Sequence, residues 1–414
     1  MQIPMKRLLF LTILCLAAVS GAAAFTYNDG RGSLSPYPGS APAVTVQDSL
    51  TPVFINHVGR HGSRYPAGPA FTMQLKTALD KADSLKTITP LGRKLLLAVN
   101  RVAAASEGRW GALDSIGMAE QRSIASNMVA HYPQLFDSAR VSAVASSSPR
   151  CVMSMYAFMH RLSESAKHIT LRASSGDAYT PLLRPFDVDE AYKTYRADTA
   201  WVSSYRRYLA ANVSIEPLLR VLGTGYPLDY ATAYDLALSE YYVLAGADAM
   251  GMPIDAKDYF TLKEWQGMWS TFNFRQYLLY SSSTVSQRPA AMAASLLQDL
   301  IATADSALSG KIADRARLRF GHAETLMPLT ALMGIPGCRY LTNYFDTVAD
   351  NWRDYASFPM AANLQLVFFR APSGTVYVRV DYNERPVQLL RNVKSDYVRW
   401  DDLRLYLLEQ LPLE

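Results

Sequence analysis

The chain has 414 residues, of which 50% are hydrophobic and 19% are charged, and its formal net charge is +5. This composition supplies enough apolar residues for a folded core and carries too little charge for a disordered chain. Loss of residues 1–24 would remove Lys6 and Arg7 and no acid, which lowers the charge to +3. So small an excess argues against nucleic acid as a partner and leaves room for an anionic small molecule.

The first 24 residues have the pattern of a secretory signal. Lys6 and Arg7 precede an apolar run over residues 8–19, and three alanines end at Ala24. The run is shorter than the ~20 apolar residues that a membrane-spanning helix needs. We therefore predict a signal peptide over 1–24 and a mature chain without a stable membrane span.

Cysteine usage bears on the compartment. Cys151 and Cys338 would remain after cleavage. Small secreted domains often depend on several disulfides, and this chain does not have the cysteines for such a framework. We expect an exported protein, periplasmic or secreted and from a bacterium. Whether the two cysteines pair stays open.

Residues 59–66 place a histidine between two arginines directly after an apolar strand, predicted over Thr51 to Asn56. A neutral imidazole such as His61 can attack phosphorus when cations hold the phosphoryl oxygens and stabilise the transition state, and Arg60 and Arg64 are suited to that task. An ordinary basic loop is the alternative for this stretch taken alone.

A second strand and turn follow. The sequence predicts a strand over Arg140 to Ala145, a turn over 146–149 and an amphipathic helix that Arg150 opens. Arg150 would then project from a strand-to-helix turn, as Arg60 and His61 do.

The middle of the chain differs in composition. Residues 187–303 are rich in tyrosine, tryptophan, alanine and leucine at helical spacings, which predicts a mainly helical cap inserted into the fold. Arg184 and Arg275 are the cations near this segment that we consider for substrate binding. Surface ion pairs are the alternative role for both.

The second histidine motif lies far downstream. An apolar run ending at Phe320 leads into Gly321, His322, Ala323 and Glu324, and a helix-like segment follows. A second histidine can bind a phosphoryl oxygen, and a carboxylic acid two residues later can protonate a leaving alkoxide. Three such residues alone could occur by coincidence. They indicate a phosphate site only together with the first motif.

These elements predict an α/β fold with a mostly parallel sheet flanked by helices and an inserted helical cap. We place the α/β catalytic domain at 25–186 and 304–414, with two late strands near 364–369 and 375–380, and the cap at 187–303. In doubly wound folds, strand-to-helix turns converge at the carboxyl edge of the sheet. One small volume would then hold the six candidate site residues: Arg60, His61, Arg64, Arg150, His322 and Glu324.

With these motifs the chain resembles the histidine phosphatase superfamily in its acid phosphatase and phytase branch. The branch carries an Arg-His-Gly-x-Arg-x-Pro loop and a later His-Asp or His-Ala-Glu. Ala323 and Glu324 follow His322 here, as in multiple inositol-polyphosphate phosphatases, and residues 183–187 resemble a Leu-Arg-Phe-Phe-Asp stretch of that subgroup.

The resemblance implies a role for each residue of the pocket. His61 would be the nucleophile that forms a phosphohistidine, Glu324 the proton donor, and the phosphoryl group would be held by Arg60, Arg64, Arg150 and His322. No metal or cofactor is implied, and the sequence has no cysteine or histidine cluster with metal-ligand spacing.

We therefore predict an exported phosphomonoesterase that hydrolyses inositol hexakisphosphate (phytate) and lower inositol polyphosphates. A histidine acid phosphatase of broad specificity is the main alternative. A phosphotransferase or mutase fits an exported chain less well. An inactive protein that captures phosphorylated ligands would not need the full set of nucleophile, cations and donor.

Overall fold

The computed structural model describes residues 24–39, 42, 44, 46–47, 49–166, 168–391 and 393–412. Apart from Ala24, the predicted signal segment lies outside the described residues. Within these ranges no helix is both long enough and apolar enough to cross a membrane.

The described strands form one sheet in the order β3-β2-β4-β1-β5-β6-β7, with β8 paired to β6. β3, β2, β4 and β1 run parallel, and β5 to β8 pair antiparallel. The predicted α/β class is confirmed, with a sheet that is parallel on one side of β1 and antiparallel on the other. The strands span β1 Thr51–Arg60, β2 Arg140–Ala145, β3 Thr170–Ser175, β4 Asp314–Gly321, β5 Asn363–Arg370, β6 Val376–Tyr382, β7 Arg385–Pro386 and β8 Val398–Arg399.

The helices begin at ordinary sequence signals. In α2 the Thr89 side chain accepts a hydrogen bond from the Gly92 amide, and α12 begins with a capping box of Thr261 and Glu264. The helices span α1 Ala70–Ser84, α2 Pro90–Ser106, α3 Ser115–His131, α4 Pro133–Phe136, α5 Pro149–Ser165, α6 Thr180–Leu183, α7 Pro185–Val188, α8 Glu190–Ala197, α9 Thr199–Asn212, α10 Glu216–Leu222, α11 Ala233–Ala247, α12 Leu262–Tyr280, α13 Arg288–Ala291, α14 Ala294–Leu308, α15 Ala323–Met333, α16 Val348–Asn351, α17 Asp354–Ser357 and α18 Trp400–Glu409.

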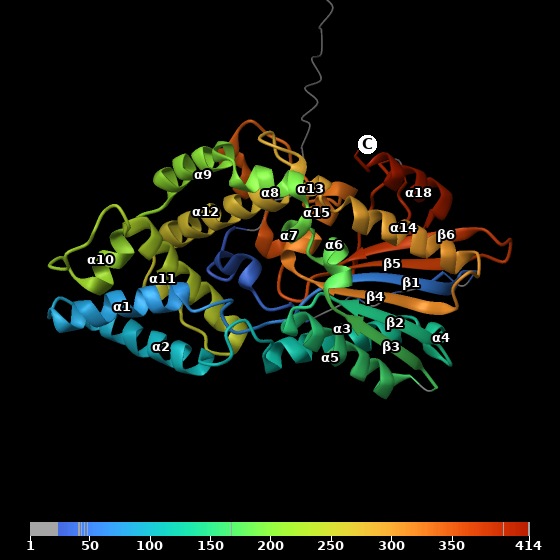
Figure 1. Ribbon diagram of the computed structural model, residues 1–414, viewed down its shortest axis with the longest axis horizontal. Coiled ribbons are helices and arrows are strands. Elements are labelled where there is room, and N and C mark those ends of the chain that lie inside the picture. The colour runs from blue at the N-terminus through green and yellow to red at the C-terminus, as the bar shows by residue number, and fades with distance from the viewer. Residues whose placement is uncertain are drawn as a thin grey trace, which may run out of the picture.

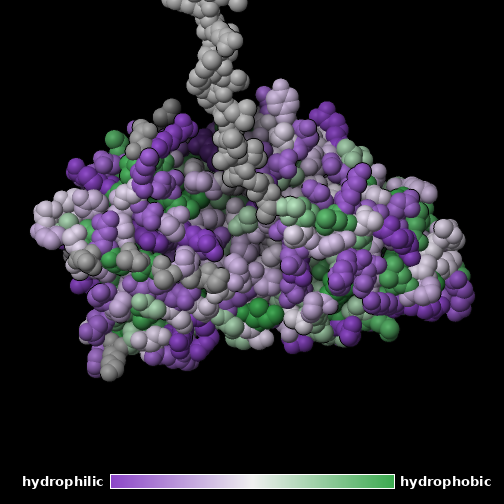
Figure 2. All heavy atoms as spheres, turned by 180° about the vertical axis from the view of Figure 1, so that it is seen from behind, coloured by the Kyte–Doolittle hydropathy of each residue, from purple (hydrophilic) through white to green (hydrophobic). Residues whose placement is uncertain are grey.

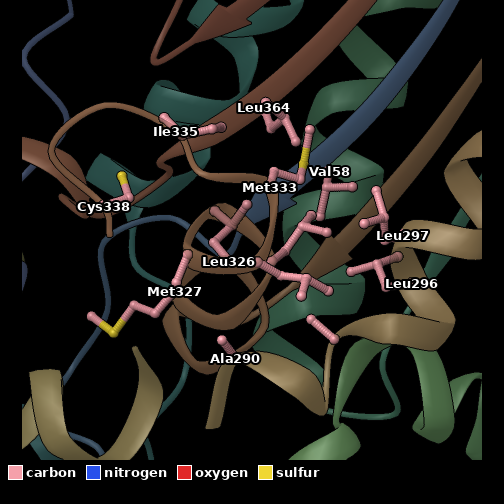
Figure 3. Packing of buried hydrophobic residues seen from close by; sticks show 14 of the residues in the cluster. Val58, Ala290, Leu296, Leu297, Leu326, Met327, Met333, Ile335, Cys338 and Leu364 are labelled. Atoms are coloured by element: carbon pink, nitrogen blue, oxygen red, sulfur yellow. The ribbon is translucent and has the colours of Figure 1, made fainter. Parts of the chain in front are cut away.

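Helices cover both faces of the sheet, as Figure 1 shows. Side chains alternate along β1, so Ile55 packs with the cluster under α3, α4 and α5, whereas Phe54 and Val58 pack with the cluster under α14, α15 and α18. In Figure 3, Leu326 and Met333 of α15 lie close to Val58 of β1. This packing fixes the start of α15 relative to the end of β1.

The other half of the molecule is helical and contains α9 to α12 (Figure 1). α1 and α2 join it from before the predicted insertion, because α1 packs on α2 and α11, and α10 packs on α2. The cap boundaries at 187 and 303 remain a prediction. Seen from behind, hydrophilic side chains cover most of the surface, and hydrophobic ones occur in small groups (Figure 2).

Glu240 is a fully buried acid within the helical half. It lies on α11, and neither carboxylate oxygen has a hydrogen-bond partner among the described residues. Burial raises its pKa to about 8, with Arg220 acting in the lowering direction and Glu264 in the raising direction. The side chain is therefore mostly protonated at neutral pH.

Glu240→Gln should make the protein more stable than the wild type by a margin that grows from pH 5 to pH 8. The native state keeps the Glu240 proton up to about pH 8, whereas the unfolded chain releases it near the usual value. Native stability is therefore lost as the pH rises, by at most about 1.4 kcal/mol per pH unit, and glutamine has no such proton. Urea unfolding at three pH values measures the margin. The exposed Glu107→Gln serves as the control, and equal behaviour of the two variants would contradict this account.

Candidate active site

The three strand-to-helix turns meet at one edge of the sheet. Arg60, the last residue of β1, pairs with Gly321, the last residue of β4, and Ala145 at the end of β2 pairs with Phe320. The His61 amide donates to the Gly321 carbonyl at 2.9 Å. The structure therefore brings both histidine motifs and the turn before Arg150 to the same place.

His61 is held as a neutral imidazole at the edge of the pocket. Its side chain is buried, and Nδ1 lies 2.9 Å from the Gly62 carbonyl, which can only accept a hydrogen bond. Nδ1 therefore carries the proton and Nε2 keeps its lone pair. Burial, followed by Arg150, Arg60 and Arg64, holds the pKa of His61 well below its usual range. These are the conditions that a nitrogen nucleophile needs at neutral pH.

Close backbone contacts fix the loop that follows His61. A Cβ at Gly62 would lie 2.4 Å from the Gly117 carbonyl oxygen, so only glycine fits there. Glu120 on α3 accepts from the Ser63 amide and hydroxyl at 2.7 Å each, and from the Tyr37 amide at 2.8 Å. Sequence reasoning missed Glu120, whose one signal is an acid on the buried face of a helix.

Three buried arginine nitrogens make the pocket a site for an anion. The Nε atoms of Arg60, Arg64 and Arg150 have no acceptor among the described residues. Arg60 is anchored by its Nη1, which donates to the carbonyls of Ser33 and Phe358 at 2.7 Å each. Buried N–H groups without acceptors are unfavourable, and phosphoryl oxygens would satisfy them.

His322 lies opposite His61, with the two ring centroids 5.6 Å apart. Arg150 Nη2 lies 3.2 Å from its Nδ1, and Ser146 Oγ lies 3.1 Å from its Nε2. Burial and then Arg150 hold the pKa of His322 well below its usual range. A neutral ring here can donate one hydrogen bond to a phosphoryl oxygen or to a neighbour.

Arg184 lies nearer to His322 than the sequence suggested. Its Nη1 is 3.1 Å from His322 Nε2, and its Nε donates to Asp187 at 2.6 Å. The cause is local, because Thr325 Oγ1 accepts from the His322 amide at 2.9 Å and donates to the Leu183 carbonyl at 2.6 Å. The segment around Arg184 is thereby tied to the second motif.

A cavity of about 480 Å³ opens above these groups. His61, Arg150 and the half-buried Glu324 line its base, and Arg275 reaches it from α12. Glu324 is in the first turn of α15, directly after the second histidine motif. All six predicted pocket residues are thus close together, and Arg275 faces the same cavity.

Comparison with known proteins decides the family. The histidine phosphatase superfamily (branch 2) matches residues 53–383. The chain belongs to this family. It is therefore a histidine-type phosphatase.

Individual relatives cover nearly the whole chain. Multiple inositol polyphosphate phosphatase 1 of Gallus gallus is 24% identical over 408 residues, which cover 90% of this chain and 84% of that protein. The structure of the Bifidobacterium longum multiple inositol polyphosphate phosphatase in complex with inositol hexasulfate superposes with a TM-score of 0.76 at 18% identity, covering 93% and 99% of the two chains. The phytase from D. castellii gives 0.71 at 17% identity, covering 96% and 88%.

Cys151 and Cys338, the two cysteines of this histidine phosphatase that lie among the described residues, are buried and free. The Cys151 thiol lies 3.1 Å from the Gly321 carbonyl, and burial raises its pKa to about 11. The disulfide that the sequence left open is therefore not formed. Across the described ranges, no group of three or more histidine, cysteine, aspartate or glutamate residues is arranged to hold a metal ion.

Gly62→Ala should reduce kcat by at least about 100-fold and lower the unfolding temperature by several degrees. The added methyl group would collide with the Gly117 backbone, which displaces His61 and the loop. Steady-state kinetics and thermal unfolding measure both effects. Gly68→Ala is the matched control, because a Cβ there meets nothing within 4 Å. Near-normal activity of the Gly62 variant would show that the loop tolerates displacement.

Proposed function

We propose that this histidine phosphatase is an exported phosphomonoesterase that hydrolyses inositol hexakisphosphate and lower inositol polyphosphates through a phosphohistidine on His61. The observation that carries the proposal is the buried, neutral His61, which keeps the lone pair on Nε2 and lines a cavity together with Arg60, Arg64 and Arg150, whose Nε atoms have no acceptor among the described residues. A donor acid, Glu324, lines the same cavity.

The proposed reaction has two steps. In the first, His61 Nε2 attacks phosphorus, the ester P–O bond breaks, and protonated Glu324 gives its proton to the leaving alkoxide. In the second, the Glu324 carboxylate takes a proton from water, the water oxygen attacks phosphorus, and the P–N bond breaks. Inorganic phosphate leaves, and His61 and Glu324 return to their first state.

The cations would act on the phosphoryl oxygens. Arg60, Arg64 and Arg150 carry planar guanidinium groups, whose N–H donors match the oxygens of a phosphoryl group. His322 would add a single hydrogen bond. Arg184, in contact with His322, would support the same group, and Arg275 would contact another part of the substrate.

Support for inositol phosphates comes from the relatives, which are named as inositol polyphosphate phosphatases and phytases, one of them holding inositol hexasulfate. Support for export comes from the charged, apolar and small-residue zones of residues 1–24. A broad-specificity acid phosphatase would use the same base of the cavity. Phosphate release from inositol hexakisphosphate, compared with release from a simple aryl phosphate, distinguishes the two, and no release from either would indicate a binding protein.

His61→Ala should lower turnover by several orders of magnitude and keep the fold, because the alanine fits the site and only the nucleophile is lost. Acid-labile phosphate trapped on the wild-type protein should be absent from the variant. Circular dichroism and thermal unfolding check the fold. Persistent labelling, or turnover near that of the wild type, would remove His61 from this role.

Glu324→Gln should slow hydrolysis of alkyl phosphates much more than hydrolysis of aryl phosphates. An alkoxide is a poor leaving group and needs the proton, whereas a nitrophenolate leaves with little help. The ratio of the two kcat values measures the effect. Arg150→Ala provides the contrast, since it should depress both substrates alike. A uniform loss in the Glu324 variant would exclude it as the general acid.

A further inference from the structure

The cavity has two unlike walls. Its base carries the catalytic arginines, and the far wall comes from α9, α11 and α12 with Phe71 of α1. The far wall is aromatic: Phe71 and Tyr242 have ring centroids 4.6 Å apart, and Tyr242 and Phe272 have centroids 6.1 Å apart. Tyr205 of α9 continues it.

Two charged residues of opposite sign lie on the far wall. Arg275 of α12 and Asp235 in the first turn of α11 both line the cavity. Both act on the phenol of Tyr205, whose pKa is raised first by burial, with Arg275 lowering it and Asp235 raising it. Both therefore lie close enough to Tyr205 to act on it across the same cavity. Neither has an ion-pair partner among the described residues, so each charge is available to a substrate.

An acid at this place is unexpected in a cavity for a highly phosphorylated ring. A carboxylate repels a phosphate and accepts a hydrogen bond from a hydroxyl. Aromatic faces likewise suit the C–H face of a cyclitol more than a shell of charged groups. Of the described residues that line this wall, Arg275 is the one cation available to the phosphates that do not react.

We propose that Asp235 and the aromatic wall select inositol rings that carry a free hydroxyl where the ring faces α11. The preferred substrates are then partly dephosphorylated inositol phosphates, and inositol hexakisphosphate is the weaker substrate. Asp235 is a specificity-determining residue in this arrangement, and Arg275 holds one remaining phosphate. This inference rests on the proposed function and names its substrate class.

The experiment compares kcat/KM for inositol hexakisphosphate and for an inositol trisphosphate. Wild-type protein should favour the trisphosphate. Asp235→Asn should shift the ratio toward the hexakisphosphate by about three- to tenfold, the size expected for screened charges across a wet cavity. Arg275→Ala should shift it the other way. Asp402→Asn, which removes an exposed acid on α18 outside the cavity lining, should leave the ratio unchanged.

The outcomes separate the two proposals. If the wild type hydrolyses both inositol phosphates and Asp235→Asn keeps its ratio, the inference fails and the proposed function stands. An equal shift in the Asp402 variant would also overturn it, because net charge would then explain the change. If the wild type hydrolyses an aryl phosphate and neither inositol phosphate, both proposals fail. Thermal unfolding of each variant checks the fold. An unfolding temperature equal to that of the wild type shows that a shifted kcat/KM ratio comes from the substrate contact.

Discussion

The main-chain hydrogen bond from His61 to Gly321 joins two motifs that lie far apart in the sequence. It exists because β1 and β4 are parallel neighbours in a register that ends both strands at the same edge of the sheet. Parallel strands need a long crossover connection, and here that connection contains the helical half that forms the far wall. The pairing of β1 with β4 therefore positions the base of the site. The connection between these two strands supplies the helices of the opposite wall.

The arginines around two buried histidines set the electrostatics of the site. Burial, and after it Arg64, lowers the pKa of Arg60 to about 10, while Glu324 and Glu120 act in the opposite direction. Burial, and after it Arg150, Arg60 and Arg64, likewise holds the pKa of His61 well below its usual range. The arginine charges that lower these pKa values also attract an anionic group such as a phosphoryl group. Perturbed pKa values of this kind are common at functional sites.

The sequence predicted the base of the site because each part has a local signal. Arg140 to Ala145 was expected as a strand and is β2, and helix signals after Arg150 and His322 correspond to α5 and α15. β1 runs on to Arg60, past the expected end at Asn56, because Gly59 and Arg60 pair with β4. Such pairing depends on a second strand, so the hydrophobic pattern of β1 alone cannot predict it.

The contacts that depend on tertiary packing could not be read from the sequence. Arg184 reaches His322 because Thr325 binds the Leu183 carbonyl, and no spacing in the chain indicates that bond. Glu120 is similar, since its role depends on α3 facing the loop at Ser63. In both cases the role of the polar side chain depends on a hydrogen-bond partner that is distant in sequence.

The two walls of the cavity have different structural origins, and this difference has a consequence for specificity. The base is fixed by strand ends and short turns, where Gly62 and Gly117 touch and little can change without loss of the geometry. The far wall consists of side chains on the faces of α9, α11 and α12. α11 packs in an apolar cluster separate from that of β1, whereas α9 and the second half of α12 pack with the cluster of β1 and α15. A substitution such as one at Asp235 alters the charge of that wall without entering the strand-end contacts. The fold therefore lets the substrate range change while the reacting groups keep their places.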